Sequence, residues 1–528
     1  MPKYNNISCR CVPTLHTYII STVLLIVVTK KRILPILLVV AVAITSAVSL
    51  EQVYAQSVSD NDQVMFYSGN SAECWMDKNH DGIMDTPCAI DSGSTVWILM
   101  TSALVLLMTP GVAFFYGGLA RTKNVVNTMG MVFIIIGLIS VQWVLWGYSI
   151  AFGPATGGIN QFVGSFDYVG LNQVSNVAPL GTPNNIGGCL DTATCHSSGF
   201  ASGVPHQVFM MFQGTFAILT PALVVGGLID RMKFSALIIF VILWASFVYD
   251  PVAHWVRGGG FLAHLDLDPS QVPSSVLDFA GGTFVHITAG FSALAAALVL
   301  GKRLGLGKIP MQPHNIPMVI LGASLLWFGW FGFTAGSRLA IDGIASNAFV
   351  VTNISAGMAS VTWLLVSWAH TGRPSIVGAA TGGIAGLVAI TPASGWVGPM
   401  AALIIGIAAG TICYGAIVFK NARKLDDALD AWGVHGIGGL IGVILTGVLA
   451  SPRINGGWGA WTGTPAGIEQ LEINSLAALF TLLYAFIVTI IILKIMDAAW
   501  PGGIRVTAKE EEVGLDLAQH GERSYTNE

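Results

Sequence analysis

The chain has 528 residues, of which 53% are hydrophobic and 10% are charged, and its mean hydropathy is +0.70. This composition excludes a soluble globular protein and predicts an all-α protein that crosses a membrane many times. The formal net charge of −4 is small, so the distribution of Lys and Arg along the chain is more informative than their sum.

The N-terminal region precedes the main set of apolar spans. Two apolar runs flank a basic triplet at 30–32, and the second run leads into a short sequence that closes with Ala55. The second run is typical of a signal peptide cleaved after Ala55, and a retained hydrophobic anchor is the alternative. We therefore expect residues 1–55 to be a signal peptide or N-terminal anchor, and residues 56–92 to be an extracytoplasmic segment.

Long apolar stretches follow, each about as long as an α-helix must be to cross a bilayer. Together they predict a transmembrane domain over residues 93–500, followed by a cytoplasmic C-terminal tail over residues 501–528. The eleven spans are expected near 94–117, 126–152, 205–228, 235–254, 282–301, 316–335, 346–369, 376–392, 397–419, 432–450 and 474–496.

Basic residues gather in alternate connections between these spans. Because cytoplasmic loops carry an excess of Lys and Arg, these connections are predicted to be cytoplasmic. The first span then begins outside the cell, the mature N-terminus lies outside, and the C-terminus lies inside. The basic residues of these loops are Arg121, Lys123, Arg231, Lys233, Lys302, Arg303, Lys308, Arg373, Lys420, Arg423 and Lys424.

Four cysteines form two close pairs on the predicted outer side, Cys74 with Cys88 and Cys189 with Cys195. Disulfides are expected in that environment, and free thiols with coincidental spacing are the alternative. Residues 77–82 match the opening of a calcium loop, but Cys88 stands where such a loop needs a glutamate. The sequence therefore favours a disulfide-closed turn over a calcium site.

Two histidines, His286 and His435, lie inside apolar spans, and each follows an aspartate, Asp278 or Asp427, by eight residues. A titratable side chain at membrane depth is costly, so a functional pair is favoured over two satisfied core histidines. Eight helical residues rise about 12 Å, close to half of a hydrocarbon core of about 30 Å, so both imidazoles are expected near the midplane. Each aspartate is expected to accept hydrogen bonds from free N–H groups where its helix begins.

The two histidine-bearing helices are predicted to enter the membrane from opposite faces. Corresponding features in two five-span halves of opposite orientation predict an inverted repeat with a site between the halves. The expected fold class is an all-α polytopic membrane protein with eleven transmembrane helices in a 5+5 inverted repeat plus one. Two neutral imidazoles that face each other can share a hydrogen bond and leave each ring one nitrogen for a small polar guest.

The segment Asp278-Phe-Ala-Gly-Gly-Thr-Phe-Val-His286 is similar to the signature of the ammonium transporter (Amt/MEP/Rh) family, and the chain resembles its Amt branch. The resemblance runs from about residue 92 to the C-terminus. Further segments similar to that family are Pro110-Gly-Val-Ala-Phe-Phe-Tyr-Gly-Gly118, Phe212-Gln-Gly-Thr-Phe216, Pro313-His-Asn-Ile-Pro317, Gly329-Trp-Phe-Gly-Phe333 through Ser337, and Gly433-Val-His-Gly436.

The resemblance implies a homotrimer in the lipid bilayer, with one path per subunit that moves ammonium inward. His286 and His435 match the family's pore histidines. Phe216 and Phe333 match two stacked phenyl rings that close the pore from outside. The implied sequence of events is recruitment of ammonium at an outer vestibule, its deprotonation, and passage of ammonia with or without the proton.

The implied outer recruitment site draws on aromatic faces and a hydroxyl, and each cation-π contact is worth about 0.5 to 2 kcal/mol. Ser337 matches the family's recruiting hydroxyl, and Trp330, beside the predicted phenylalanine gate, is also assigned to the outer recruitment site. Asp278 matches a buried structural acid that supports the site.

One departure from the family's pattern lies at the predicted recruitment site. Counting back from the glycines at 258–260, Arg257 stands where that family usually has a tryptophan. A guanidinium there would repel ammonium. Two alternatives remain open: Trp255 supplies the aromatic face after a local shift of the backbone, or Arg257 points away toward Asp266 or Asp268.

Ammonium and potassium ions are alike in charge and size, so a selective pore needs another criterion. Ammonium can lose a proton, and potassium cannot. A narrow apolar pore costs an ion at least about 3 kcal/mol, while neutral ammonia crosses at little cost and can hydrogen-bond to imidazoles.

The tail after Pro501 is polar and carries acidic residues at 510–512. A solvated tail is the simplest interpretation. The resemblance implies instead that the tail packs on the cytoplasmic face and couples subunits, with a PII-type signal protein as a candidate partner. Asp427 and Asp430, near Lys420, are expected to form a solvated, salt-bridged loop.

Two other functions stay open, an ammonium sensor with little flux and an Rh-like pore for another small neutral molecule such as carbon dioxide. A sensor is expected to carry a signalling domain after its last span, and the PII-compatible tail disfavours the Rh-like pore. No motif predicts enzyme activity, a cofactor, a metal site or a nucleic-acid partner.

Overall fold

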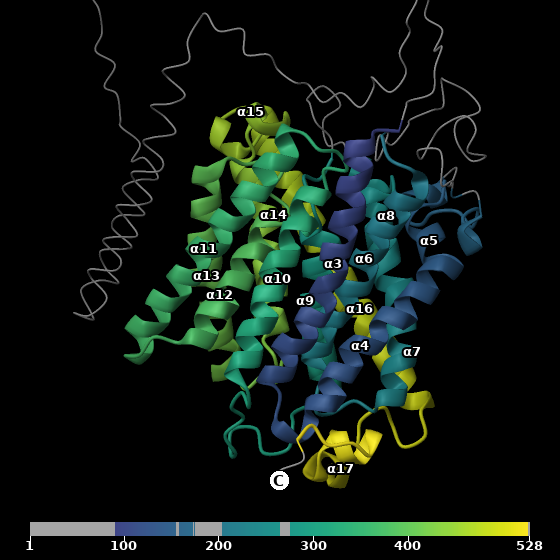
Figure 1. The fold of residues 1–528 in the computed structure, drawn as a ribbon, viewed down its shortest axis with the longest axis vertical. Coiled ribbons are helices and arrows are strands. Elements are labelled where there is room, and N and C mark those ends of the chain that lie inside the picture. The colour runs from purple at the N-terminus through teal and green to yellow at the C-terminus, as the bar shows by residue number, and fades with distance from the viewer. Residues whose placement is uncertain (1–89, 155–157, 173, 175–202, 265–274, 526–528) are drawn as a thin grey trace, which may run out of the picture. The chain divides into compact units, whose positions relative to one another are not determined.

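The computed structural model describes residues 90–154, 158–172, 174, 203–264 and 275–525. Residues 90–366 and 375–525 belong to one compact unit, which is an all-helical bundle in the described part (Figure 1). Several sequence predictions concern residues outside the described ranges. These are the signal peptide or anchor over 1–55, nearly all of the 56–92 segment, both cysteine pairs, and Asp266 and Asp268 as partners of Arg257.

The first half of the bundle contains five spans, of which two are interrupted by a π-helical turn and a third begins with one. They are α3 (Ser92–Leu119); α4 (Val125–Gln142) with η3 (Trp143–Gly147) and α5 (Tyr148–Phe152); α6 (His206–Val224); α7 (Phe234–Trp244) with η7 (Ala245–Tyr249) and α8 (Asp250–Arg257); and η9 (Gly282–Ile287) with α9 (Thr288–Leu300). Short 3-10 turns join them at η2 (Thr122–Asn124), η4 (Gly158–Gln161), η5 (Val169–Leu171), η6 (Val225–Gly227) and η8 (Phe261–His264).

The second half also contains five spans, and an eleventh follows. They are α10 (Ile316–Gly336), α11 (Gly343–Thr371), α12 (Ile376–Ile390), α13 (Pro399–Ala422), η10 (Trp432–Gly436) with α14 (Ile437–Leu449), and α16 (Pro465–Ala499). The remaining elements are α15 (Pro452–Asn455), η11 (Ala460–Thr462), α17 (Ala508–Val513) and the π-turn η12 (Asp516–His520).

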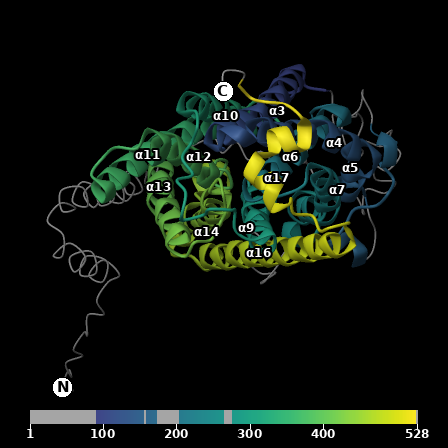
Figure 2. The same ribbon diagram turned by 90° about the horizontal axis from the view of Figure 1, so that it is seen from below.

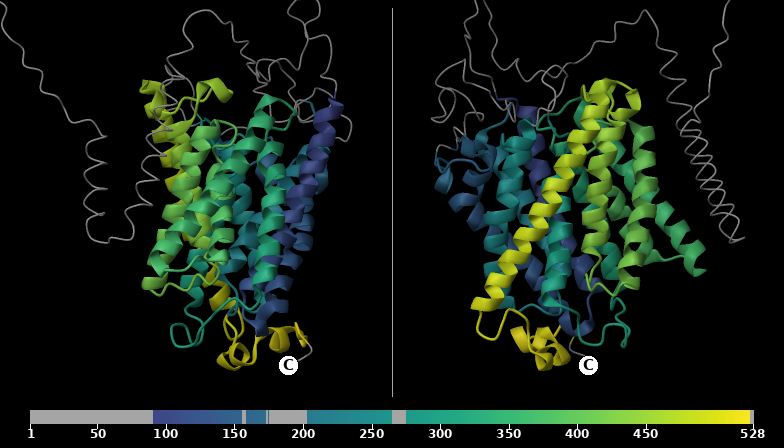
Figure 3. Two further views of the ribbon diagram at one scale, coloured as in Figure 1. Left: turned by 60° about the vertical axis from the view of Figure 1, so that its left-hand side comes forward. Right: turned by 180° about the vertical axis from the view of Figure 1, so that it is seen from behind.

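Eleven spans are therefore found where the sequence predicts them. In the described residues, ten helices are long and apolar enough to cross a membrane, and α12 is a shorter apolar helix. The last span begins at Pro465 rather than near 474, because the Thr464 hydroxyl accepts a hydrogen bond from the Gly467 N–H and caps the helix there. This helix crosses the bundle obliquely in the right panel of Figure 3.

Glycines allow the first spans of the two halves, α3 and α10, to approach closely. A Cβ atom on Gly322 would lie 2.2 Å from the backbone nitrogen of Phe115, and one on Gly329 would lie 2.4 Å from Cγ of Met108. Small residues at helix contacts serve this purpose in membranes, where apolar side chains gain little by leaving lipid.

The fifth and tenth spans meet in the same way. A Cβ atom on Gly290 of α9 would lie 2.0 Å from the backbone nitrogen of Gly436, which ends η10. A Cβ atom on Gly439 of α14 would lie 2.9 Å from Cβ of His286. The contact between these spans therefore depends on glycine, and it brings the two predicted pore histidines together.

The tail packs against one end of the bundle, which we call the tail face and which lies at the bottom of Figure 1 and toward the viewer in Figure 2. Val506 donates its N–H to the carbonyl of Arg231 at 2.8 Å, and Arg505 donates to the carbonyl of Leu300 at 2.6 Å. Glu511 is 1% exposed and accepts the N–H of Leu304 at 2.6 Å. The tail is thus not a freely solvated segment.

A buried ion-pair network on the tail face joins the two halves. Arg303 contacts Asp426 at 2.8 Å and Asp230 at 3.3 Å, and Arg231 contacts Asp426 at 3.5 Å. Burial alone would raise the pKa of Asp426, but hydrogen bonds from Arg303 and the charges of both arginines outweigh it and hold this pKa below its usual value. Burial lowers the pKa of Arg231 to about 10, so its guanidinium stays charged at neutral pH.

Candidate functional site

Both predicted pore histidines lie in π-helical turns. His286 lies in η9 and His435 in η10. A π-turn replaces the i to i+4 hydrogen-bond pattern with i to i+5, a feature found often at functional sites. The sequence predicts ordinary α-helix between each aspartate and its histidine, and this expectation is wrong at the histidines themselves.

Asp278 fixes the start of η9. Its carboxylate accepts backbone N–H groups from Gly281 at 2.8 Å, Gly282 at 2.7 Å and Thr283 at 2.7 Å, and it also accepts the Thr283 hydroxyl. Gly281 has φ +117°, a conformation that suits glycine. The prediction that Asp278 accepts N–H groups at a helix start is confirmed.

Asp427 has the corresponding place before η10. Its carboxylate accepts the N–H of Trp432 at 2.8 Å, as predicted. The residue is fully buried, so the expectation that it belongs to a solvated loop is wrong. The nearby pair of Lys420 with Asp430 at 2.5 Å is the predicted salt bridge, and Lys420 also donates to the carbonyl of Asp427.

The histidine rings lie next to each other, with nearly parallel planes, between the two halves. Nδ1 of His435 lies 3.4 Å from Nδ1 of His286, the ring centroids are 5.4 Å apart, and the ring planes meet at 24°. The side chains come from spans that begin at opposite ends of the bundle. The predicted hydrogen bond between two imidazoles is therefore present.

Thr391, just after α12, defines which ring nitrogens carry protons. Its hydroxyl donates to the carbonyl of Leu387 at 2.8 Å, so its oxygen accepts from Trp330 Nε1 at 2.9 Å and from His286 Nε2 at 3.3 Å. His286 is then protonated on Nε2 and accepts on Nδ1. His435 donates from its own Nδ1, and its Nε2 is left as an acceptor.

The sequence reasoning missed Thr391. A single threonine at the end of an apolar helix carries no distinguishing pattern, because hydroxyls commonly bond to the carbonyl one turn earlier. The packing of α10, α12 and η9 around one point is what gives this hydroxyl two further partners.

Aromatic rings continue the histidine stack toward the face opposite the tail. The rings of Phe216 and Phe333 stack at 4.2 Å with an angle of 26°, and both side chains are buried. Phe333 lies 5.8 Å from the His286 ring, and Trp330 lies 5.3 Å from both rings. Rings in van der Waals contact leave no space between them, so the predicted gate pair is closed in this structure.

A small cavity lies on the other side of the histidine pair. Its volume is about 10 Å³, and His435 forms part of its wall. That volume is close to the minimum that holds one water molecule. The remaining wall is mostly apolar and comes from Val112, Phe115, Tyr116, Leu223, Leu326, Thr381, Ile384, Leu429, Ala431 and Val434.

The predicted recruitment residues are only partly brought together. Ser337 follows Phe333 by one helical turn, and its hydroxyl donates to the Phe333 carbonyl at 2.8 Å. Arg257 donates from Nη2 to the carbonyl of Phe279 at 2.6 Å and approaches the carbonyl of Ser337 at 3.5 Å. Its guanidinium thus lies beside the Ser337 carbonyl, and the alternative partners Asp266 and Asp268 lie outside the described residues.

Trp255 lies elsewhere. Its indole N–H donates to the carbonyl of Phe162 at 2.8 Å, and its ring packs on Phe261 at 5.1 Å and on Tyr484 of α16 at 4.6 Å. The structure does not bring Trp255 to Ser337. The α8 helix runs unbroken to Arg257, and it directs residues two apart to different sides.

Metal ligands are not grouped near this site. In the described residues, no set of three or more His, Cys, Asp or Glu side chains could hold a metal ion. Cys413 is buried within α13 and packs in the hydrophobic core. The described side chains of the site offer hydrogen bonds and aromatic contacts.

Comparison with known proteins gives one consistent answer. The sequence profile described as "Ammonium Transporter Family" matches residues 96–525. The chain is 43% identical over 438 residues to "Ammonium transporter Amt1" of Archaeoglobus fulgidus, covering 83% of this chain and 100% of that protein. It is 44% identical over 436 residues to "Ammonium transporter" of Bacillus subtilis, covering 82% and 98%.

Solved structures agree with the sequence relatives. Saccharomyces cerevisiae Mep2 superposes with a TM-score of 0.71 at 34% identity, covering 83% of this chain and 92% of that one. A protein described as "Sensor Amt Protein" gives 0.68 at 26% identity, covering 81% and 98%. With a family profile that spans most of its length and relatives above 40% identity, the chain belongs to the ammonium transporter family.

Proposed function

We propose that the protein is an ammonium transporter or channel that passes ammonia, with or without its proton, along His286 and His435. One observation carries the proposal: two hydrogen-bonded imidazoles lie between a closed pair of phenyl rings and a cavity of about 10 Å³. The relatives named as ammonium transporters support it.

The dry, apolar surroundings of the histidines select for a neutral guest. His286 is fully buried and His435 is 5% exposed, and apolar side chains form most of the adjacent cavity wall. An ion in such surroundings costs at least about 3 kcal/mol, and potassium cannot avoid this cost by losing a proton. Ammonium can, so deprotonation ahead of the histidines separates the two ions.

The protons on the histidine pair give ammonia a defined set of partners. With His286 protonated on Nε2 and His435 on Nδ1, the Nε2 of His435 is an acceptor, and His435 borders the inner cavity. Ammonia donates well and fits this acceptor. The proton can follow separately, because each imidazole can take a proton on one nitrogen and release one from the other.

The phenyl rings of Phe216 and Phe333 act as the gate on the outer side of the histidines. At 4.2 Å they exclude even water, so at least one ring must rotate about χ1 or χ2 before ammonia passes.

Orientation and assembly complete the proposal. Arg121, Arg231, Arg303 and Arg505 all contact partners on the tail face, which supports assigning that face to the cytoplasm. Transport then runs from the opposite face inward. We include a homotrimer and a PII-type signal protein at the tail as further parts of the proposal, supported by the family resemblance.

Reconstituted vesicles test the transport step. Ammonium-driven flux should be clear for the parent and should fall by at least about tenfold in His286→Ala, which removes the acceptor for His435 Nδ1 and the ring between Trp330 and His435. Phe133→Ala, at a side chain that is 71% exposed on α4, controls for expression and insertion. A parent that gives no flux above protein-free vesicles would exclude transport.

A sensor with little flux is the second candidate, because one solved neighbour is described as a sensor. A sensor should bind ammonium with a measurable heat by calorimetry and yet give no flux in the same vesicles. A transporter should give flux, whether or not ammonium binding gives a measurable heat. Flux in the parent therefore removes this candidate.

A further inference from the structure

Arg257 places a positive charge at the outer end of the path. It is the last residue of α8, and its guanidinium lies between the carbonyls of Phe279 and Ser337. Ser337 lies one helical turn beyond the gate ring Phe333, and four residues of helix rise about 6 Å. A guanidinium beside Ser337 is therefore about one helical turn outside the gate.

Among the described residues, no carboxylate forms a close ion pair with this guanidinium. None of the ion pairs in the part of the chain that the structure describes includes Arg257. Asp278 interacts with it electrostatically without a direct ion pair, because its carboxylate oxygens bond to the start of η9. The partners of Nη2 are neutral carbonyls, which stabilise the guanidinium without adding a negative charge.

A buried donor of Arg257, its Nε–H, has no hydrogen-bond partner among the described residues. A guanidinium has five N–H donors and no acceptor. A molecule that is to bind Nε–H must therefore offer a lone pair, and ammonia has one whereas ammonium has none.

We propose that Arg257 is a tethered cation at the mouth of the path, so that the substrate enters as neutral ammonia and not as ammonium. This inference rests on the proposed function and specifies the chemical form that the mouth admits. A second cation beside the guanidinium is repelled, strongly so in a partly buried site of low dielectric. Ammonia meets no repulsion and can accept the free Nε–H.

With Arg257 at the mouth, deprotonation comes before entry, and not after recruitment of the cation. Deprotonation takes place in bulk water, where ammonium gives its proton to solvent, and no cation waits between Arg257 and the gate. Transport is then electroneutral, and its rate follows the concentration of ammonia. A path that recruits the cation instead saturates with ammonium and can carry current.

The test distinguishes transport of ammonia from transport of ammonium. The pH and the total ammonium concentration are changed together, so that the ammonia concentration stays constant while the ammonium concentration changes. Vesicles with a trapped pH-sensitive dye report alkalinisation on arrival of ammonia, and a solid-supported membrane reports charge. At constant ammonia, raising ammonium about tenfold should change the parent rate by less than about twofold, with no ammonium-dependent current. Arg257→Trp should gain a current that saturates with ammonium.

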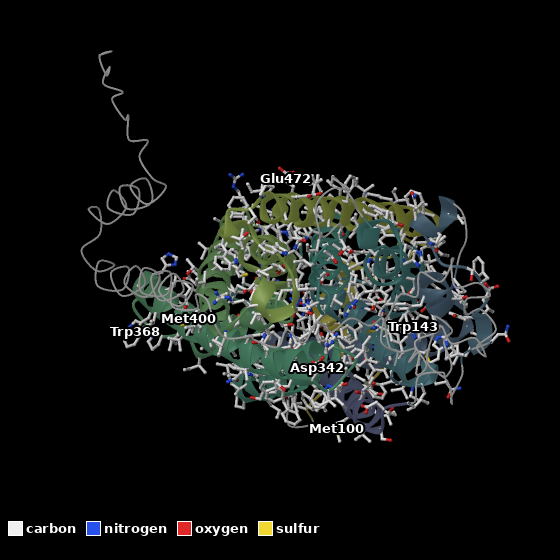
Figure 4. All side chains as sticks on the ribbon, turned by 90° about the horizontal axis from the view of Figure 1, so that it is seen from above. Met100, Trp143, Asp342, Trp368, Met400 and Glu472 are labelled. Atoms are coloured by element: carbon white, nitrogen blue, oxygen red, sulfur yellow. The ribbon has the colours of Figure 1, made fainter. Side chains whose placement is uncertain are left out.

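Two matched variants test whether the positive charge at position 257 is what makes transport electroneutral. Arg257→Lys keeps a cation that only donates, so it should retain electroneutral transport. Arg338→Gln removes an arginine that pairs with Asp342 at 2.6 Å. Asp342 is labelled in Figure 4, which views the bundle from the end opposite the tail face. That variant should behave as the parent.

The outcomes are distinct from those of the transport test. A parent current that grows with ammonium at constant ammonia overturns the role of Arg257 while transport stands. An Arg257→Trp protein that still transports electroneutrally overturns it as well. If that variant fails to insert, the parent measurement at paired pH values decides the question by itself. A parent with neither flux nor current removes the proposed function itself.

Discussion

The hydroxyl of Thr391 orients the protons of the histidine pair. It is the common acceptor of Trp330 Nε1 and His286 Nε2, and it uses its own hydrogen on the Leu387 carbonyl. Two buried donors therefore depend on one oxygen. A buried donor without a partner costs about 1 to 3 kcal/mol, so this position should be sensitive to loss of the hydroxyl alone.

Thr391→Val tests this dependence with little change in volume. We expect a loss of about 2 kcal/mol in the free energy of unfolding and a fall in ammonia flux of about tenfold, because His286 loses the partner that fixes its tautomer. Thr391→Ser keeps the oxygen and should restore most of both. Thermal unfolding in detergent and vesicle flux are the measurements. A valine variant with parent flux would show that the tautomer is fixed by other groups.

Glycine contacts at the scale of helices set the distance between the histidines. Spans five and ten touch where Gly290 meets Gly436, and the second histidine is the residue before Gly436. Any side chain at Gly290 would push η10 away from α9, and the nearest atoms are backbone that cannot rotate aside. The 3.4 Å contact between the imidazoles is thus held by helix packing as well as by its own hydrogen bond.

Gly290→Ala should separate the two spans. We expect a loss of at least about 2 kcal/mol in the free energy of unfolding, since overpacking of a tight core costs about 1 to 3 kcal/mol, together with a strong loss of flux. Gly415→Ala in α13 is the control, because a Cβ atom there meets nothing within 4 Å. Alanine should be neutral or slightly stabilising at that helical position. Equal melting temperatures for both variants would contradict the packing argument.

The whole molecule is joined across its tail face by charges. Arg303 bridges Asp230 of the first half and Asp426 of the second, and Arg231 is buried between them and the tail. Breaking one partner of a buried ion pair costs about 3 to 5 kcal/mol, because the other charge is left uncompensated. This network couples the loop before η10 to the end of α9.

Asp426→Asn should therefore destabilise the protein in a pH-dependent way. The folded pKa of Asp426 lies below its unfolded value, so its contribution is fully present above the unfolded pKa and is lost as the pH falls through the folded one. The difference in melting temperature between parent and variant should be large at pH 7 and should narrow below about pH 4. A difference that is constant over this range would mean that the carboxylate charge is not what stabilises the loop.

Periodicity and composition predict the elements of this protein well. Apolar runs long enough to cross a bilayer are a local property, so ten spans and the shorter α12 lie where the sequence places them. The aspartates that start the histidine helices are also predictable, because a free N–H group and a carboxylate a few residues away meet within one turn. The family signature gives the histidine pair and the phenylalanine pair, which the structure finds stacked.

Tertiary structure alone decides the remaining features. The π-turns at both histidines, the two donors that meet at Thr391, and the opposite directions of Trp255 and Arg257 all depend on neighbours from distant helices. By itself the sequence determined where the helices lie and which chemical groups they carry, since hydrophobic length and capping act within one segment. Which groups share a partner is decided only when the two halves pack, because a hydrogen bond requires about 3 Å between atoms that the sequence places a hundred residues apart.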